Sequence, residues 1–591
     1  MLEKIRTVEG RQEPCKRKVC RLPDRIYKWK QYTKRVVYAL IVIGLILLAG
    51  CQKERSKQEQ EGKVGQITQN GILFSHDSGL YEAPELKVHM KAPEGYTIAF
   101  TTDGTKPSAK NASGKSELDV ILKNKMSGYL LEHKQLMLCP EFYNSVLYQD
   151  HELPAGVVLN TALVDANGAV DSKIQTNVYF LNENFAKRFP NCLIISITTD
   201  QRNLLDYNTG ILASGAVYDA WKKTDEGKKL IASQEWWEVE TNSTQHGKKW
   251  ERPCQIQFYT KGSKPVLEMN AGLRVRGGMS RRQNQKSFTL YFRDNYGSDK
   301  LHFALFDKIN DYKTFALRNG GNDSEYLKFK DAFLQDLGKG GKFTVLDSRQ
   351  AVVFLNGEYW GPYSLNELVS GNTMQTRFAV DPDNVVVIKE SEVQVGKKED
   401  IRYYDELRAF DHMDLTDSDV YRRFCKVMDV QAMADYFAMR IYIGDSDWSR
   451  VHNHILWRTK DKSYNGGRWQ FIVHDTDYSA GHYGERKTSP ATDHFRLAIE
   501  NFPVFGAALK NKEFYNIFLA SIKKIGSENY KFSRVREEMD AYDKVWEPLM
   551  RDFYKRFGDT SRLRKQCMNS TLSFFQRRYN IIIPIVEKWI P

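Results

Sequence analysis

The sequence predicts a multidomain chain in which a small all-β sandwich precedes an α+β domain with a helical C-terminal part. Short alternating apolar runs separated by turns occupy residues 67–182. Strand-like and helix-like runs mix from residue 190, and apolar residues at helical spacing dominate from about 500 to 591. With 41% hydrophobic and 12% aromatic residues, the 591-residue chain can bury sizeable cores and is not disordered.

The N-terminal segment has the features of an export signal. A basic stretch precedes an uncharged apolar run, Val36 to Gly50, which is shorter than the ~20 residues of a spanning helix and ends at Cys51. Leu48 to Cys51 also matches the bacterial lipobox, in which the cysteine is lipidated. We therefore predict that residues 1–51 are a lipoprotein signal peptide, that Cys51 carries the lipid, and that 52–66 are a polar tether. A short signal-anchor helix is the alternative.

These features predict an exported protein held at a membrane, with the outer membrane or cell surface favoured.

The charge distribution argues against a nucleic-acid partner. The net charge is +13, but the first 51 residues contain 12 basic and 4 acidic side chains, which leaves only +5 over the rest. Binding of nucleic acid by phosphate neutralisation needs a concentrated basic surface, and none is evident in this pattern.

Five cysteines follow Cys51, far apart and without a CxxC pair, at positions 139, 192, 254, 425 and 567. Their spacing excludes zinc-finger and dithiol-redox motifs. We expect them to be buried free thiols rather than disulfides.

Period-2 alternation and turn residues define the strands of the β region. Strands are expected at residues 86–90, 98–100, 157–163 and 178–181. Asp103-Gly104 is typical of a hairpin turn, and Asn167-Gly168 marks a second turn.

The mixed domain shows both periods. Strands are expected at 193–197, 272–276, 288–292 and 469–473, with helices at 331–337 and 433–441. Beyond residue 502, runs such as FYNIFLASIKKI predict a helical part that packs on the mixed domain.

Two segments of this domain combine glycines with polar side chains. Arg274 to Arg293 places paired glycines and several cations between two strands, and turn amides beside Arg and Lys suit an anion such as phosphate. The segment lacks the GxxxxGK[ST] pattern of a P-loop. In the second segment, Arg318 to Asp323 (RNGGND), Asn322 and Asp323 can act simply as helix caps.

Two further segments concentrate carboxylates. IYIGDSDWSRVHNHILWR places Asp445, Asp447 and Asn453 between a helix and a strand, and GGRWQFIVHDTDYSAG places Asp475 and Asp477 at a strand's end. Hard oxygen ligands of this kind suit Mg²⁺ or Mn²⁺ carrying phosphate groups. A carboxylate left free of metal could accept a hydroxyl proton during phosphoryl transfer.

Five segments in order resemble the spore-coat protein H (CotH) kinase family, from about residue 193 to 589. They are RGGMSRRQNQKSF, LRNGGND, VVFLNGEYWGPYSLNE, DSDWSRVHNHILW and WQFIVHDTDYSAG. The resemblance implies an atypical protein-kinase-like fold that uses ATP and Mg²⁺ or Mn²⁺ to phosphorylate Ser or Thr of secreted or surface proteins. The preceding β region resembles the immunoglobulin-like module at the C-terminus of chitobiases and hexosaminidases, which would serve as a spacer or a glycan contact.

The resemblance also implies roles for single residues. Asp447 would be the catalytic base, and the metal site would contain Asn453 and Asp475 with Asp477 in support. Among the nucleotide-binding residues, Lys286 would contact the phosphates, and Arg276 and Arg281 are further candidate phosphate contacts. Glu367 would lie on the same side, where we expect it to pair with Lys286.

Two departures from the family pattern leave alternatives open. Gly278-Met279 replaces a usual Asn-Ser pair, and one extra residue after Asp447 leaves His452 as an alternative to Asn453. Together with His454 and His474, His452 keeps a His/Asp transition-metal site possible in principle. A metal-dependent phosphoesterase and a non-catalytic surface lipoprotein that binds glycan or protein are the alternative functions.

Overall fold

The computed structural model describes residues 70–123, 130, 133–142, 153–306 and 310–591. The predicted signal peptide with Cys51 and the predicted tether, residues 1–51 and 52–66, lie outside this part of the chain. Every helix of the described part falls short of the length and apolar character that a membrane crossing requires.

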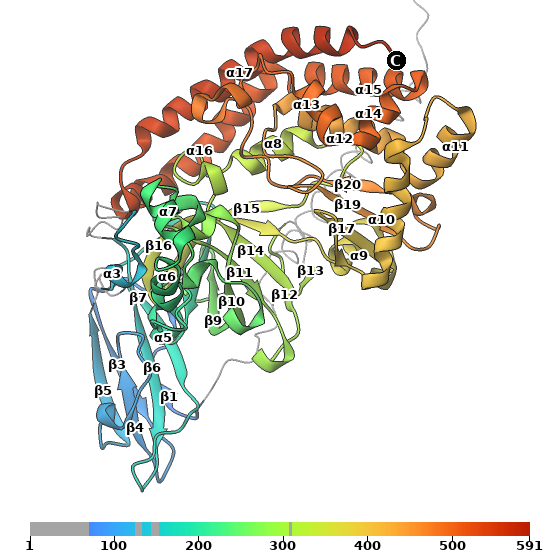
Figure 1. Cartoon of the computed structure of the whole chain (residues 1–591). Helices are drawn as coiled ribbons and strands as arrows, with labels where there is room; N and C mark the ends of the chain where they lie inside the picture. The colour runs from blue at the N-terminus through green and yellow to red at the C-terminus, as the bar shows by residue number, and fades with distance from the viewer. Residues whose placement is uncertain (1–69, 124–129, 131–132, 143–152, 307–309) are drawn as a thin grey trace, which may run out of the picture. The chain divides into compact units, whose positions relative to one another are not determined.

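Two small sheets form an N-terminal β-rich region (Figure 1), with strand orders β1-β3-β5 and β2-β7-β6-β4. Residues of both sheets, among them Val88, Ile98 and Leu159, share one hydrophobic core. The four strands predicted here are confirmed. The strands are β1 Leu73–Phe74, β2 Gly79–Tyr81, β3 Glu85–Lys91, β4 Thr97–Thr101, β5 Glu117–Lys123, β6 Gly156–Val164 and β7 Gln175–Leu181.

The hairpin predicted at Asp103-Gly104 is wrong, although the turn itself forms. Gly104 has a φ of +82° and the Asp103 carboxylate accepts the Thr105 amide. Strand β4 nevertheless pairs with β6, whereas the next strand, β5, pairs with β3 in the other sheet. A short 3₁₀ helix, Ala109–Asn111, follows Pro107 and carries the chain from one sheet to the other.

A closed barrel follows, with strand order β10-β11-β14-β16-β15-β8-β9. Its interior is filled by aliphatic and aromatic side chains such as Ile195, Phe288 and Leu317. The barrel strands are β8 Leu193–Thr198, β9 Arg252–Tyr259, β10 Leu267–Arg276, β11 Ser287–Tyr291, β14 Thr314–Arg318, β15 Ser348–Leu355 and β16 Glu358–Glu367. A second core, with Phe180 and Phe354 in edge contact at 4.9 Å, joins strand β7 to the barrel.

A smaller sheet has the strand order β18-β17-β19-β20, and its Val386, Leu456 and Phe471 share a hydrophobic core with the helices. Its members are β17 Val385–Lys389, β18 Glu392–Val395, β19 Ile455–Thr459 and β20 Gln470–Ile472. A two-stranded sheet contains β12 Leu301–Phe303 and β13 Asn310–Tyr312. The strands predicted at 193–197, 288–292 and 469–473 are confirmed within one residue at each end, and the strand predicted at 272–276 is confirmed but begins five residues earlier, at Leu267.

Helix α12, Val430–Ile443, is almost entirely buried among the C-terminal helices (orange to red in Figure 1). The helices are α3 Lys134–Met137, α4 Phe185–Arg188, α5 Gln201–Leu205, α6 Gly215–Trp221, α7 Asp225–Ala232, α8 Lys330–Gly338, α9 Gly371–Phe378, α10 Ile401–Arg408, α11 Ser418–Val427, α13 His494–Asn501, α14 Pro503–Leu509, α15 Lys512–Lys524, α16 Phe532–Phe557 and α17 Ser561–Glu587. The predicted helical C-terminal part is thus confirmed. Buried Arg556 of α16 pairs with Glu358 of β16 at 2.8 Å, which fixes that helix to the barrel.

The cysteines at 139, 192, 254, 425 and 567 are free thiols, and all but Cys425 are buried. Burial raises the pKa of the Cys139 and Cys192 thiols to about 12. These cysteines therefore behave as small apolar core residues.

Candidate functional site

One fully buried arginine ties together the two segments that carry the predicted site. Arg440 of α12 forms an ion pair with Asp445 in which neither side chain is exposed. It also donates to the carbonyl oxygens of His474 (2.6 Å), Asn453 (3.1 Å) and Asp475 (3.3 Å). Because one guanidinium donates to backbone carbonyls of both loops, it fixes the position of one loop relative to the other.

Asn453 and Asp475 both have a φ of +55°, in the left-handed region. Asn and Asp tolerate this conformation better than other non-glycine residues, and such positions are frequent at functional sites. The Arg440 contacts to the carbonyls of these two residues hold the turns in place.

Asp447 lies on the open side of its loop with a side chain that is 41% exposed. The side-chain amide of Asn453 donates to the Asp447 backbone carbonyl at 2.8 Å and to Asp447 Oδ2 at 3.3 Å. His452 Nε2 also lies 3.3 Å from Asp447 Oδ2. These contacts orient the carboxylate through one oxygen. The hydrogen bond to Asp447 raises the pKa of His452.

Asp475 and Asp477 belong to a cluster of three carboxylates around Arg318, the last residue of β14. Arg318 Nη2 pairs with Asp475 Oδ1 and, at 2.6 Å, with Asp477 Oδ2, while Nη1 lies 3.2 Å from Asp331 Oδ2 on α8. Asn322 donates to the other oxygen of Asp477 at 3.0 Å. Burial opposes ionisation of Asp475, yet Arg318 holds the pKa of Asp475 below its usual range.

The neighbouring turn is built for this close approach. Gly321 has a φ of +63°, and a Cβ there would lie 2.3 Å from Asp477 Oδ2 and 2.9 Å from Arg318 Nη2. The LRNGGND segment therefore needs glycine at this position, and it does more than cap a helix. Asp323 is not the N-cap residue of α8, which is Phe329, but its carboxylate accepts the backbone amides of Leu327 and of Lys330, the first residue of that helix, at 2.9 Å each.

All but one of the described residues predicted for the site line one cleft of about 640 Å³ between the barrel and the β17–β20 sheet. The residues are Arg276, Arg281, Glu367, Asp447, Asn453, Asp475 and Asp477. The volume lies within the range typical of small-molecule and cofactor sites. The exception, in the described part of the chain, is Lys286.

Lys286 is buried beneath the turn between β10 and β11. Its ammonium donates to the carbonyls of Arg281 (2.9 Å) and Gln283 (3.1 Å), and burial lowers its pKa to about 8. Glu367 instead receives hydrogen bonds from Arg377, so the expected Glu367–Lys286 pair is wrong. In this structure the Lys286 ammonium bonds the carbonyls of the turn and does not face the cleft. Its contact with a phosphate stays a prediction.

Arg276 is the cation best placed to meet a phosphate. It lines the cleft, and its guanidinium has no hydrogen bond or ion pair with any residue that the structure describes. Arg281 also lines the cleft, but its guanidinium donates to the carbonyls of Gly277, Ser243 and Gln245. Arg281 therefore shapes the turn rather than leaving its charge available.

Three histidines were candidates for a transition-metal site. His452 and His474 line the cleft, whereas His454 is buried against Tyr436, Phe471 and Phe502. Burial lowers the pKa of His454 to about 3, so it stays neutral in the core.

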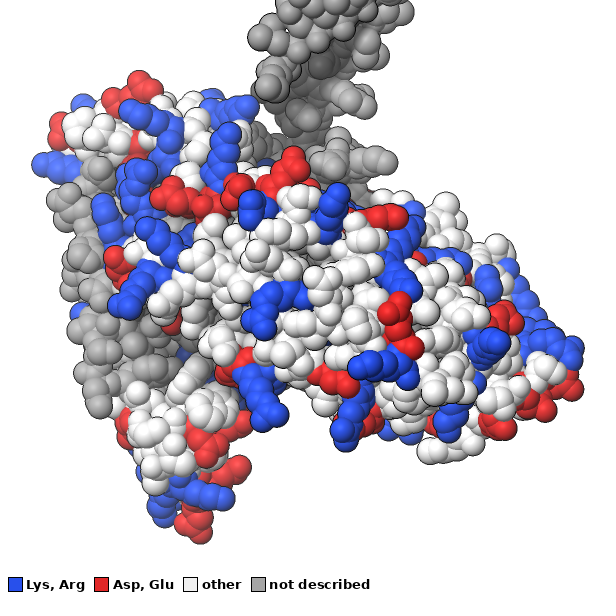
Figure 2. All heavy atoms as spheres, turned by 90° about the horizontal axis from the view of Figure 1, so that it is seen from above, with Lys and Arg blue, Asp and Glu red and all other residues white. Residues whose placement is uncertain are grey.

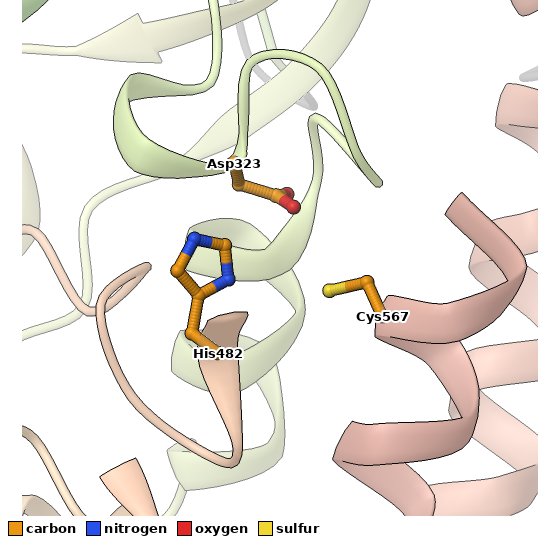
Figure 3. Close-up of side chains that lie close together, drawn as sticks. All are labelled: Asp323, His482 and Cys567. Carbon is orange, nitrogen blue, oxygen red and sulfur yellow. The ribbon is translucent and has the colours of Figure 1, made fainter. Parts of the chain in front are cut away.

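A second cluster, Asp323, His482 and Cys567, has metal-ligating atoms that lie within 4.8 Å of one another (Figure 3). The ammonium of buried Lys330 lies 3.4 Å from His482 Nδ1, where it takes the place of a cation next to this nitrogen. His482 Nε2 faces the Asn322 carbonyl at 3.1 Å, so both ring nitrogens have partners. Both Asp323 oxygens are also bonded, and burial raises the pKa of the Cys567 thiol to about 11, which disfavours the thiolate that a metal needs. This cluster therefore anchors the Asn322 turn.

The cleft, in contrast, offers oxygen ligands for a divalent metal. Arg318 bonds only Oδ1 of Asp475, and Asn453 uses its Nδ2 to bond Asp447. Within the described structure, Asp475 Oδ2 and Asn453 Oδ1 receive no hydrogen bond and are left to bind a metal. Asp477 has both oxygens bonded and is 2% exposed, so it supports the site without a free ligand atom. Carboxylate and amide oxygens match the preference of Mg²⁺ and Mn²⁺.

The resemblance to the CotH kinase family implies that the cleft binds Mn-ATP. On that expectation, Arg276→Gln should weaken Mn-ATP binding about tenfold or more, because a hydrogen bond to a charged group contributes about 1.5–3 kcal/mol. Lys286→Met should instead lower the midpoint of thermal unfolding and leave the affinity within about threefold. Isothermal titration with Mn-ATP, beside thermal unfolding of each variant, measures both. Loss of affinity in Lys286→Met at unchanged stability would restore Lys286 to the phosphate site.

Sequence reasoning missed Arg318, Arg440 and Lys389, which lies at the end of β17 beside the cleft. Arg318 stands within the LRNGGND motif, so its position beside two glycines was an available signal. Arg440 lies inside an apolar helix, where a lone arginine already demands a buried partner.

A family model described as CotH kinase protein matches residues 273–587. No curated protein matches the chain.

Proposed function

The chain belongs to the CotH kinase family, and from this premise we propose that its cleft binds ATP with Mg²⁺ or Mn²⁺ and transfers the γ-phosphate to Ser or Thr of a secreted or surface protein. The observation that carries the proposal is the convergence of Asp447, Asn453, Asp475 and Arg276 in one cleft. Phosphoryl transfer depends mainly on positioning and charge neutralisation, and these residues supply both.

Each of these groups has a defined role in the proposed reaction. Asp475 Oδ2 and Asn453 Oδ1 would hold the metal, which when bound supplies positive charge to the phosphates. Arg276 would contact the phosphates from the β10 side. Asp447, held through Oδ2 by Asn453 and His452, would accept the acceptor hydroxyl's proton at Oδ1.

We also propose that residues 190–591 have an atypical protein-kinase-like fold and that the β-rich region is an immunoglobulin-like sandwich of the chitobiase type. Strands arranged as two sheets around one core support the second assignment. The same region could contact glycan.

Export and anchoring through a lipid on Cys51 at the outer membrane or cell surface complete the proposal. Nucleic acid is not part of it. Figure 2 shows Lys and Arg interspersed with Asp and Glu over the described residues of one face, rather than a continuous basic field.

Thermal unfolding with and without Mn-ATP tests the proposal. Ligand at about 100 times its dissociation constant stabilises a protein by roughly 2.7 kcal/mol, so the wild-type midpoint should rise by several degrees. Asp475→Asn should lose this rise because it removes a metal-binding carboxylate. Phosphate release from a generic ester without ATP would favour the phosphoesterase, and an unchanged midpoint at millimolar Mn-ATP would favour a binding protein.

A further inference from the structure

Arg318 occupies the centre of the acidic cluster. Its guanidinium contacts Asp331, Asp475 and Asp477 at once, and its own side chain is 13% exposed. Three carboxylates this close would repel one another strongly in a partly buried setting. The arginine is therefore the cation that makes the cluster tolerable in the metal-free protein.

The three contacts are not equivalent. Asp477 is 2% exposed and is also held by Asn322, while Asp331 accepts the amide and hydroxyl of Thr476 at 2.8 and 2.9 Å. Asp475 is 30% exposed, faces the cleft and has no other hydrogen-bond donor among the described side chains. Its contact with Arg318 is the one that can be released while the other two remain.

We propose that Arg318 acts as a resident counter-cation that competes with the divalent metal for Asp475. A divalent metal at Asp475 Oδ2 brings positive charge next to the guanidinium on Oδ1. The repulsion releases Arg318 from Asp475, while Arg318 stays paired with Asp477 and Asp331. The exchange raises the metal concentration needed to load the site and keeps the acidic cluster folded when metal is scarce. This inference rests on the proposed function, since it assumes that Asp475 binds the metal.

Mn²⁺ alone, without nucleotide or acceptor, is the probe for this exchange. In the purified full-length chain, Arg318→Gln should lower the metal-free unfolding midpoint and bind Mn²⁺ at least tenfold more tightly than wild type by isothermal titration. Arg318→Lys keeps the charge but cannot make three contacts at once, so its Mn²⁺ affinity should rise severalfold. This second variant decides the question if Arg318→Gln does not fold.

Arg188→Gln is the matched control. Arg188 forms a two-point pair with Asp552 away from the cleft, so its loss should reduce stability without changing Mn²⁺ affinity. Mn²⁺ affinity at or below the wild-type value in the folded Arg318 variants would overturn the exchange. If Asp475→Asn binds Mn²⁺ like wild type, the metal assignment itself is wrong, whereas loss of binding in Asp475→Asn leaves the proposed function standing whatever the Arg318 variants do.

Discussion

Asp447→Asn is expected to lower phosphoryl transfer by about 10²–10⁴-fold and to leave Mn-ATP binding within about threefold of wild type. A positioned general base contributes roughly that factor, and the substitution removes the base while preserving size and hydrogen-bonding capacity. Asp447 Oδ1 has no hydrogen bond from a described residue, so this oxygen is free to accept the proton, and no described group bonded to it could act as the base instead. Transfer of labelled γ-phosphate to the chain itself or to casein, with parallel titration of Mn-ATP, separates the rate from the affinity.

The comparison variant is Asp475→Asn, which should lose nucleotide binding and transfer together. Asp419→Asn, an exposed carboxylate paired with Arg422 on α11, should change neither. Transfer by Asp447→Asn at the wild-type rate would remove Asp447 from the chemistry, even if the nucleotide still binds in the cleft.

Arg440→Gln should have the largest effect on stability, lowering the free energy of unfolding by about 3–5 kcal/mol. Removing one partner of a buried ion pair leaves the other charge uncompensated, and here Asp445 has no exposed surface. Burial already raises the pKa of Asp445 to about 6 with Arg440 present. Three backbone carbonyls would also lose their donor, so Mn-ATP binding should disappear with the loop geometry. Urea unfolding measures the first effect and titration calorimetry the second.

An exposed arginine supplies the control for this measurement. Arg422 pairs with Asp419 on the surface of α11, where ion pairs contribute about 0–1 kcal/mol. Equal losses of stability in Arg440→Gln and Arg422→Gln would show that the buried arginine does not organise the site.

Local pattern was sufficient for most elements because apolar residues recur in the sequence at the spacing of a strand or of a helix. The alternation around Val88 and Phe288 and the helical spacing through α12 all identified the correct element. Strand pairing was not predictable in the same way. The Asp103-Gly104 turn forms as expected, but the partner of β4 is a strand more than fifty residues further along the chain.

The site residues show the same difference between what a local pattern predicts and what tertiary packing decides. Asp447, Asn453 and Asp475 could be identified because their motifs are local, and the cleft brings them together. The direction of a side chain depends on tertiary packing, which a motif does not contain. Lys286 therefore turned out to support a turn, and the arginines at 318 and 440 became evident only once their partners from distant segments were in place.

A crystal structure of the full-length chain with Mn²⁺ and a non-hydrolysable ATP analogue tests the central claim most directly. The account predicts an anomalous Mn²⁺ signal about 2.0–2.2 Å from an Asp475 carboxylate oxygen and from Asn453 Oδ1, with the γ-phosphate directed toward Asp447. Mn²⁺ and nucleotide bound elsewhere, with Arg318 still joined to Asp475 and the cleft open, would contradict it.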